Sequence, residues 1–123
     1  MSKAFDKDGN LLKIAFFAEL DGETFLYREF NKDLNLIVET YAIGEKSIQK
    51  AYYSNKKLAY TREGKLDEDY NLLTNGKYTE YYKNGQIKVQ GSYKEGKRDG
   101  EFKAFLKNGK SAGSVFYKDG KII

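Results

Sequence analysis

The sequence predicts an all-β protein built from about five repeated hairpins. Two closely similar stretches of equal length follow one another, at residues 76–99 and 100–123. Turn-forming pairs such as Asp-Gly and Asn-Gly recur at short intervals along the whole chain, and closely spaced turn signals are typical of all-β folds. The sequence contains no proline, so nothing prevents continuous strand ladders. Its length indicates one domain, residues 1–123.

The repeat is the strongest signal in the sequence. Residues 76–99 read GKYTEYYKNGQIKVQGSYKEGKRD, residues 100–123 read GEFKAFLKNGKSAGSVFYKDGKII, and the two align without a gap. A fixed period of this length indicates a repeat architecture. The repeat is clear over residues 76–123 and degenerate over residues 1–75. Several positions of the first copy meet the same residue in the second: Gly76, Lys83, Asn84, Gly85, Tyr93, Lys94, Gly96 and Lys97.

The turn signals alternate between two kinds. We interpret those at residues 9, 33, 56, 85 and 109 as the tips of successive hairpins, and those at residues 22, 44, 64, 96 and 120 as the connections between hairpins. Successive tips are almost evenly spaced along the chain, except for one longer step between residues 56 and 85. The longer step predicts one irregular connection, around Leu66–Asn75.

The N-terminal runs LLKIAFFAEL, TFLYREF and NLIVETYAI are more apolar than the later strands. Their β-branched and aromatic residues favour strands with little exposed surface. A short apolar run cannot be assigned from periodicity alone, so a short helix over residues 11–20 is the alternative.

The pair Asn84-Gly85 predicts a two-residue type I′ turn, in which both central residues have positive φ. This turn pairs Tyr82 with Ile87, Glu80 with Val89 and Tyr78 with Gly91. Because side chains alternate between the two faces of a strand, each C-terminal hairpin then has one apolar and one lysine-rich face. The candidate partner-binding residues share the lysine-rich face: Tyr81, Lys88, Lys103, Phe105 and Phe116.

These aromatic side chains have three explanations. Aromatics among lysines can anchor a protein partner, or they can stack on single-stranded nucleic acid. A single-layer sheet also has little core, so large side chains on both faces can be purely structural. We favour a protein over a nucleic acid as the partner. Tyr81 lies opposite Lys88 in the predicted register, which indicates a cation–π contact between them.

The composition excludes several kinds of active site. The sequence has no histidine and no cysteine, which removes Ser-His and Cys-His catalysis, ordinary zinc sites and disulfides. No P-loop or dinucleotide-binding fingerprint is present. Residues 6–10 only begin to match a calcium-binding loop, whose later ligands are missing. We therefore expect no enzymatic activity, no cofactor and no metal.

The sequence leaves the compartment open. No apolar run has the length of a transmembrane helix, and the N-terminal run MSKAFDKDGN is too polar for a signal peptide. A signal removed before Met1 would leave the same sequence.

Residues 76–121 resemble two bacterial MORN-type repeats, of the variant found in YwqK-like antitoxin proteins. The first copy carries the pattern at Gly76, Lys77, Tyr78, Tyr81, Tyr82, Asn84, Gly85, Ile87, Gly91, Tyr93, Gly96, Lys97 and Gly100. The second copy has Val115 in place of a glycine and Ser111 in place of a hydrophobic residue. The resemblance implies an elongated single-layer antiparallel β-meander and a role in protein–protein contact. Proteins of the antitoxin branch are thought to neutralise a partner toxin, and other MORN repeats have been linked to membrane lipids.

Two functional hypotheses follow. The first is a non-enzymatic protein–protein interaction module, with an antitoxin or immunity-type protein as its specific form. The alternative is an envelope-associated structural protein that contacts anionic lipid or polymer through Lys88, Lys103, Lys107 and Lys110, in keeping with a net charge of +4.

Two further features of the sequence bear on contacts. The C-terminal edge near residues 115–123 could pair with another copy of the chain. The acidic cluster at Asp67–Asp69 is interpreted as a solvated loop. Because it lies in the irregular connection, it is also a candidate for a specific contact.

Overall fold

The computed structural model describes residues 2–5, 11–19, 24–31, 33, 35–43, 46–68 and 71–123. These residues form one twelve-stranded antiparallel sheet and contain no helix, hence none that could cross a membrane. The strands are β1 (Ser2–Phe5), β2 (Leu11–Glu19), β3 (Thr24–Asn31), β4 (Leu36–Ile43), β5 (Lys46–Tyr52), β6 (Leu58–Leu66), β7 (Leu72–Tyr81), β8 (Ile87–Lys94), β9 (Lys97–Arg98), β10 (Gly100–Phe105), β11 (Ser111–Lys118) and β12 (Lys121–Ile122).

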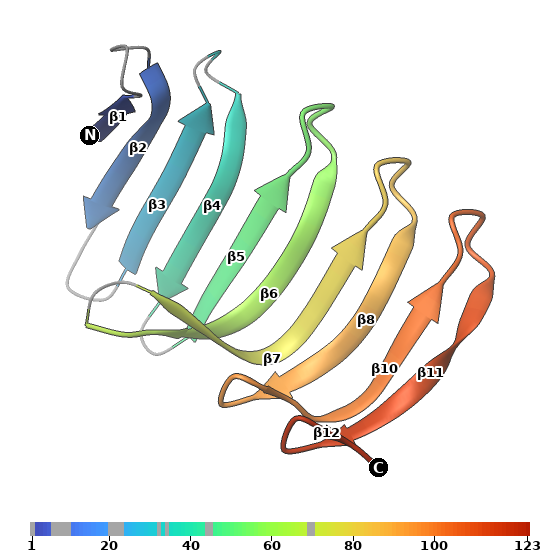
Figure 1. Ribbon diagram of the computed structural model, residues 1–123. Helices are drawn as coiled ribbons and strands as arrows, with labels where there is room; N and C mark the ends of the chain where they lie inside the picture. The colour runs from blue at the N-terminus through green and yellow to red at the C-terminus, as the bar shows by residue number, and fades with distance from the viewer. Residues whose placement is uncertain are drawn as a thin grey trace.

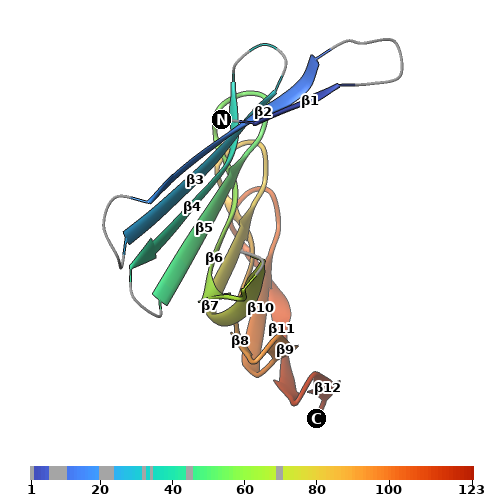
Figure 2. The ribbon, with the colours of Figure 1, turned by 90° about the vertical axis from the view of Figure 1, so that its left-hand side faces the viewer.

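The strands are arranged as a meander. Neighbours in the sheet follow the chain from β1 to β8 and then to β10, β11 and β12, while β9 pairs with β8 beside this path. Five hairpins result: β1–β2, β3–β4, β5–β6, β7–β8 and β10–β11 (Figure 1). The view in Figure 2 shows a single curved layer, in which the described strands are covered by no second sheet. The predicted single-layer meander of about five hairpins is confirmed, and residues 11–19 are a strand, as predicted.

Each hairpin contains a register shift at the same place near its tip. A bulge of this kind bends a strand and increases its right-handed twist. Because the shift recurs in every hairpin, it contributes the same bend to each unit of the sheet. The residue that the pairing passes over is Leu12, Ile37, Ala59, Lys88 or Ala112 in the successive hairpins.

The tip at Asn84-Gly85 is longer than the predicted type I′ turn. The N–H of Gly85 donates to the carbonyl of Tyr82 (3.0 Å), the N–H of Tyr82 donates to the carbonyl of Gln86 (2.8 Å), and Gly85 has a φ of 91°. Asn84 keeps a negative φ, and its side chain accepts the N–H of Gln86 at 2.9 Å. This is a type I turn followed by a left-handed glycine.

The longer tip changes one predicted pair. Tyr81, instead of Tyr82, pairs with Ile87, whereas the predicted pairs Glu80–Val89 and Tyr78–Gly91 are confirmed. The bulge at Lys88 absorbs the difference.

Type I′ turns occur instead at two of the predicted connections, Glu95-Gly96 and Asp119-Gly120. Both residues of Glu95-Gly96 have positive φ (49° and 82°), and so do both residues of Asp119-Gly120 (52° and 85°). Each turn leads back into a short strand, β9 or β12.

The connection predicted at residue 64 lies inside a strand. β6 continues through Gly64 to Leu66, and the N–H of Asp67 beyond its end donates to the carbonyl of Asn71 (2.9 Å). Gly64 is buried, and a Cβ atom there would lie 2.2 Å from the carbonyl oxygen of Leu73. This glycine therefore permits close packing of β6 against β7 and does not mark a turn. The predicted tip at residue 9 and the connections at residues 22 and 44 lie outside the described residues.

A ladder of five aromatic rings packs one face of the sheet, which we call the ladder face. Neighbouring ring centroids along the ladder are 6.3, 5.5, 5.6 and 5.3 Å apart. The first pair, Tyr60 and Tyr78, is stacked, and the other three are edge-to-face. Ring pairs in these arrangements contribute about 0.5–1.5 kcal/mol beyond their buried area. Among the described residues few apolar side chains are fully buried, so this ladder carries much of the packing. Its members are Tyr60, Tyr78, Tyr93, Phe102 and Tyr117.

Because Gly91 has no side chain, it leaves room for the ring of Phe102, the most buried ring of the ladder. Phe102 is 7% exposed, and a Cβ atom on Gly91 would lie 2.6 Å from its ring. The glycine of one unit is therefore required by the aromatic residue of the next unit.

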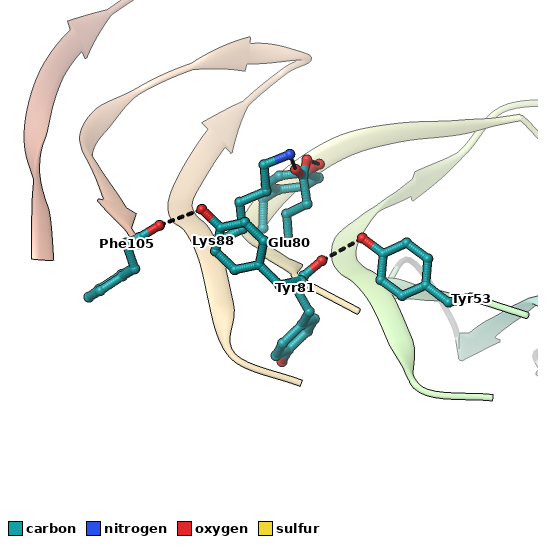
Figure 3. A network of polar contacts seen from close by, with 7 residues as sticks. Tyr53, Glu80, Tyr81, Lys88 and Phe105 are labelled. Atoms are coloured by element: carbon teal, nitrogen blue, oxygen red, sulfur yellow. Dashed lines mark hydrogen bonds and ion pairs between the residues drawn. The ribbon is translucent and has the colours of Figure 1, made fainter. Parts of the chain in front are cut away.

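Side chains at two of the tips clamp one hairpin to the next. The hydroxyl of Tyr82 donates to the carbonyl of Phe105 (2.7 Å), and the amide of Asn84 donates to the carbonyl of Lys107 (2.8 Å). The preceding tip repeats both contacts one unit earlier: Tyr53 to Tyr81 (2.6 Å) and Asn55 to Lys83 (2.9 Å). Figure 3 shows the two tyrosine contacts.

Gly91→Ala is expected to destabilise the fold by about 1–3 kcal/mol, because the new methyl group forces the Phe102 ring from its seat. Urea unfolding monitored by tyrosine fluorescence measures the loss. Ser92→Ala, on the opposite face of the same strand, serves as the control. Adding Phe102→Leu to Gly91→Ala should recover part of the lost stability. If the effects of the two substitutions on the free energy of unfolding simply add, the ring of Phe102 does not pack against Gly91.

Asn84→Ala is expected to destabilise the fold more than Asn108→Ala. Both side chains accept a local N–H, from Gln86 and Lys110 respectively, but in the described structure only Asn84 also donates to a neighbouring tip. The difference should be about 0.5–1 kcal/mol, the net value of one hydrogen bond. Equal losses in urea unfolding would show that the clamp contributes nothing.

Candidate partner-binding face

The side of the sheet opposite the ladder is the candidate contact face. Residues paired across neighbouring strands point to the same side, so the register defines one row across this face. The row is mostly short and polar in its C-terminal half. Its members are Arg28, Glu39, Lys50, Thr61, Thr79, Gln90, Lys103 and Ser114.

An aromatic residue lies two positions beyond this row in each described hairpin, beside the tip. We call this set the tip-side aromatic row: Phe30, Tyr52, Tyr81 and Phe105. All four are half-buried. In Figure 3 the rings of Tyr81 and Phe105 point to the side away from Glu80. The repeat therefore places similar side chains at regular intervals along one edge of the contact face.

Sequence reasoning missed Phe30 and Tyr52 as members of this row. It compared faces only in the two clear repeats, because the earlier units match the pattern poorly. One signal could have found them, since an aromatic residue precedes the residue that closes each of these tips. Phe5 occupies the same position by sequence.

A hollow of about 270 Å³ lies on the contact face over β7, β8 and β10. Its floor is low because Thr79, Gln90 and Ser92 are shorter than the aromatic residues of the tip-side row. The ion pair between Lys103 and Glu101 (3.7 Å) borders it. Its full lining is Lys77, Tyr78, Thr79, Gln90, Gly91, Ser92, Glu101 and Lys103.

The structure brings three of the five predicted partner-binding residues together. Tyr81 and Phe105 stand at the tip side, and Lys103 stands beside them at the hollow. Phe116 belongs to the same face and is 51% exposed, but it pairs with Glu101 at the end of the strand away from the tip.

Lys88 is not placed against Tyr81 as predicted. Its ammonium lies 3.4 Å from the carboxylate of Glu80 and 5.8 Å from the centroid of the Tyr82 ring, on the far side from Tyr81 (Figure 3). The bulge at Lys88 is the physical reason, because it breaks the simple alternation of side chains. The predicted cation–π contact with Tyr81 is therefore wrong, and the ring that Lys88 covers is Tyr82.

The four lysines predicted to contact anionic lipid or polymer do not form one surface. Lys88 and Lys103 are ion-paired with Glu80 and Glu101 on different sides of the sheet. Lys107 and Lys110 lie at a hairpin tip instead.

In the acidic connection, two hydrogen bonds join Asp67 and Asn71. The N–H of Asn71 donates to the side chain of Asp67 (2.8 Å), and the N–H of Asp67 donates to the carbonyl of Asn71 (2.9 Å). Glu68 is exposed, and Asp69 lies outside the described residues. No group of three metal-ligating side chains occurs in the described part of the chain.

Glu63 fills the irregular pairing between β6 and β7 just before that loop. Its carboxylate accepts the backbone N–H of Lys77 (2.8 Å) and lies 3.3 Å from the ammonium of Lys46. The N–H of Lys77 first, and Lys46 second, hold the pKa of Glu63 below its ordinary value. This carboxylate thus replaces strand pairing that the irregular register interrupts.

Glu63→Gln is expected to lower the free energy of unfolding at neutral pH by about 1 kcal/mol, because the charged acceptor is lost. A carboxylate whose pKa is lowered by folding stabilises the protein above its unfolded-state pKa, ordinarily 4.5, and this contribution is lost as the pH falls through the folded-state value. The two proteins should therefore converge in acid. Urea unfolding across the pH range tests this, and a constant difference would contradict it.

Comparison with known proteins gives one match. Residues 74–95 and 98–119 match the family model of the MORN repeat variant. Searches of curated proteins and of solved structures found no match. Each matched segment spans most of one hairpin, β7–β8 or β10–β11. The two C-terminal hairpins are therefore similar in sequence to MORN repeats.

Proposed function

We propose that this chain is a non-enzymatic module that binds a protein partner on the contact face, at Tyr81, Phe105 and the adjoining hollow. One observation carries the proposal. The ladder on the opposite face packs the sheet, whereas no aromatic ring of the described residues stacks on Tyr81 or Phe105. Their rings are thus available for contact, and aromatic side chains held on a rigid surface are typical anchors in protein interfaces.

The hollow next to these rings supports the same function. A partner side chain entering it would meet the hydroxyl of Thr79, the amide of Gln90 and the Lys103–Glu101 pair. Polar groups beside aromatic anchors fix the orientation of a bound chain. The combination of aromatic and polar side chains on the described part of this face supports a binding role.

The specific form of this proposal is an antitoxin or immunity-type protein. It rests on the resemblance of the two C-terminal repeats to those of the antitoxin branch, and on a face that is rigid before binding. In this role the contact face would cover a surface that the partner needs for its own activity.

A photoreactive phenylalanine analogue incorporated at Tyr81 or Phe105 in the native host is expected to capture one specific protein. Mass spectrometry of the cross-linked product identifies the partner. The same analogue at Leu106, on the ladder side of the same hairpin, is the matched control. Equal products from the two faces, or none from Tyr81 and Phe105, would contradict the proposed face.

The double variant Tyr81→Ala, Phe105→Ala should bind the captured protein at least about tenfold more weakly, since two anchor side chains are removed. Circular dichroism checks that it folds. If the partner is a toxin, co-expression of the wild-type chain restores growth and the double variant does not. If the captured partner is not toxic, the proposed binding function stands and the antitoxin role is rejected.

A further inference from the structure

The tips of the three C-terminal hairpins form a row of positive charge. Their segments are residues 53–57, 82–86 and 106–110, which read YSNKK, YKNGQ and LKNGK and contain no acidic residue. The two earlier tips differ, since residues 6–10 and 31–35 both include aspartate. The charge is therefore confined to one part of the tip edge. We call its five side chains the tip lysines: Lys56, Lys57, Lys83, Lys107 and Lys110.

Internal ion pairs do not account for the tip lysines. The lysine ion pairs among the described residues involve Lys46, Lys65, Lys88 and Lys103, all outside the three tips. In the same part of the chain no carboxylate reaches a tip lysine, although Lys83 lies 5.9 Å from the Tyr53 ring centroid. The tip lysines are thus left with charge that an acidic partner can neutralise.

The row is held at a fixed spacing. The three tips lie side by side along one edge of the sheet (Figure 1). Two strand spacings separate neighbouring tips, or about 10 Å. The amides of Asn55 and Asn84 bind the backbone of the next tip and so fix their relative positions. A charged row that is already ordered loses less entropy on binding than a flexible one.

The position of the row connects it to the contact face. Tyr52, Tyr81 and Phe105 each directly precede the residue that closes one of the three tips. A chain bound across the tip-side aromatic row would therefore run alongside the tip lysines. In an extended chain about three residues span the distance between neighbouring tips.

We propose that the tip lysines bind an acidic segment of the protein partner, with carboxylates spaced to meet successive tips. This inference rests on the proposed function and names the chemistry of the partner. A protein segment fits better than a membrane, because Leu106 is the one aliphatic side chain among the three tip segments, whereas insertion into a membrane surface needs a whole apolar face. It fits better than single-stranded nucleic acid, because the hydroxyls of Tyr53 and Tyr82 are bound to the next tip. A lysine also lies over each of these two rings, at 5.9 and 5.8 Å from the centroid, where a base would have to stack.

The test uses the full chain and a fluorescent oligoglutamate peptide as the probe. Fluorescence anisotropy should show binding that weakens strongly between about 0.1 M and about 1 M salt, where the Debye length falls from roughly 10 to roughly 3 Å. The variant Lys57→Gln, Lys83→Gln, Lys110→Gln removes one charge from each tip and should bind about tenfold more weakly. The control Lys94→Gln, Lys97→Gln, Lys118→Gln removes the same charge from the connection side of the sheet and should bind like the wild type.

Several results would overturn the proposal. They are absence of oligoglutamate binding, an equal loss in both triple variants, and tighter tip-dependent binding of phosphatidylserine vesicles or of a single-stranded oligonucleotide. Cross-linking from Tyr81 and Phe105 is measured with the native partner, separately from the binding of oligoglutamate. The proposal for the tip lysines can therefore be rejected while partner binding at the aromatic residues is supported. Partner binding at the aromatic residues can likewise be rejected while the tip lysines still bind oligoglutamate.

Discussion

The structure depends on contacts that each unit makes with the next. A single-layer sheet has no second layer to bury its apolar side chains, so packing must run along the sheet. Here the ring of Phe102 covers Gly91 of the preceding unit, and its neighbours in the ladder are Tyr93 and Tyr117. In repeat proteins of this kind, stability is approximately a sum of unit and neighbour terms. The fold therefore rests on a glycine in one unit and an aromatic residue in the next.

Because the rings pack along the ladder face, the contact face is left for other interactions. With the ladder on one side and the tip clamps along one edge, the packing described for β6 to β11 involves no ring stacked on Tyr81 or Phe105. The contact face is itself packed in its N-terminal half, where Glu39 is 5% exposed and its carboxylate lies 2.6 Å from the guanidinium of Arg28. Aromatic residues remain there at regular positions, next to a hollow floored by short polar side chains. The same repeat that builds the ladder thus also spaces the residues proposed to bind a partner.

Much of this could be predicted because it is encoded locally. Turn pairs and the repeat were sufficient for the number of hairpins and the meander, and alternation along strands separated Tyr78 from Tyr81. The type of each tip was not predictable from the Asn-Gly pair alone. Asn84 supports either loop, and the bulge at Lys88 is formed only when the paired strand imposes its register. The side of Lys88 was therefore predicted incorrectly.

Long-range packing was also invisible to the sequence patterns. Gly64 carries the signature of a turn, yet it lies in a strand. Its role there is to leave room for the backbone of Leu73, which occupies the place of a side chain. Phe30 and Tyr52 were overlooked because their units depart from the repeat elsewhere. What they retain is a position relative to the tip. A comparison of units aligned on the closing residue of each tip would have recovered the whole aromatic row.

In the unit of residues 100–123, the positions that contact a following unit in the preceding repeat carry different residues. Val115 replaces the seat glycine and is 40% exposed, and Leu106 replaces the clamping tyrosine. Ile122 replaces Arg98, whose guanidinium lies 5.3 and 5.2 Å from the ring centroids of Phe102 and Tyr117. A ring placed over Val115 would contact its side chain, whereas the ring of Phe102 packs over Gly91, which has no side chain.

The outer edge of β11 is shielded in the same unit. The N–H of Ile123 donates to the carbonyl of Phe116 at 2.9 Å, so the returning strand β12 covers part of that edge. Gly113, with a φ of 121°, interrupts the regular geometry of the remainder. Short and interrupted edges pair poorly with other strands. Pairing of this edge with a second copy would therefore have to displace β12, which makes the contact face and the tips the more accessible surfaces for a partner.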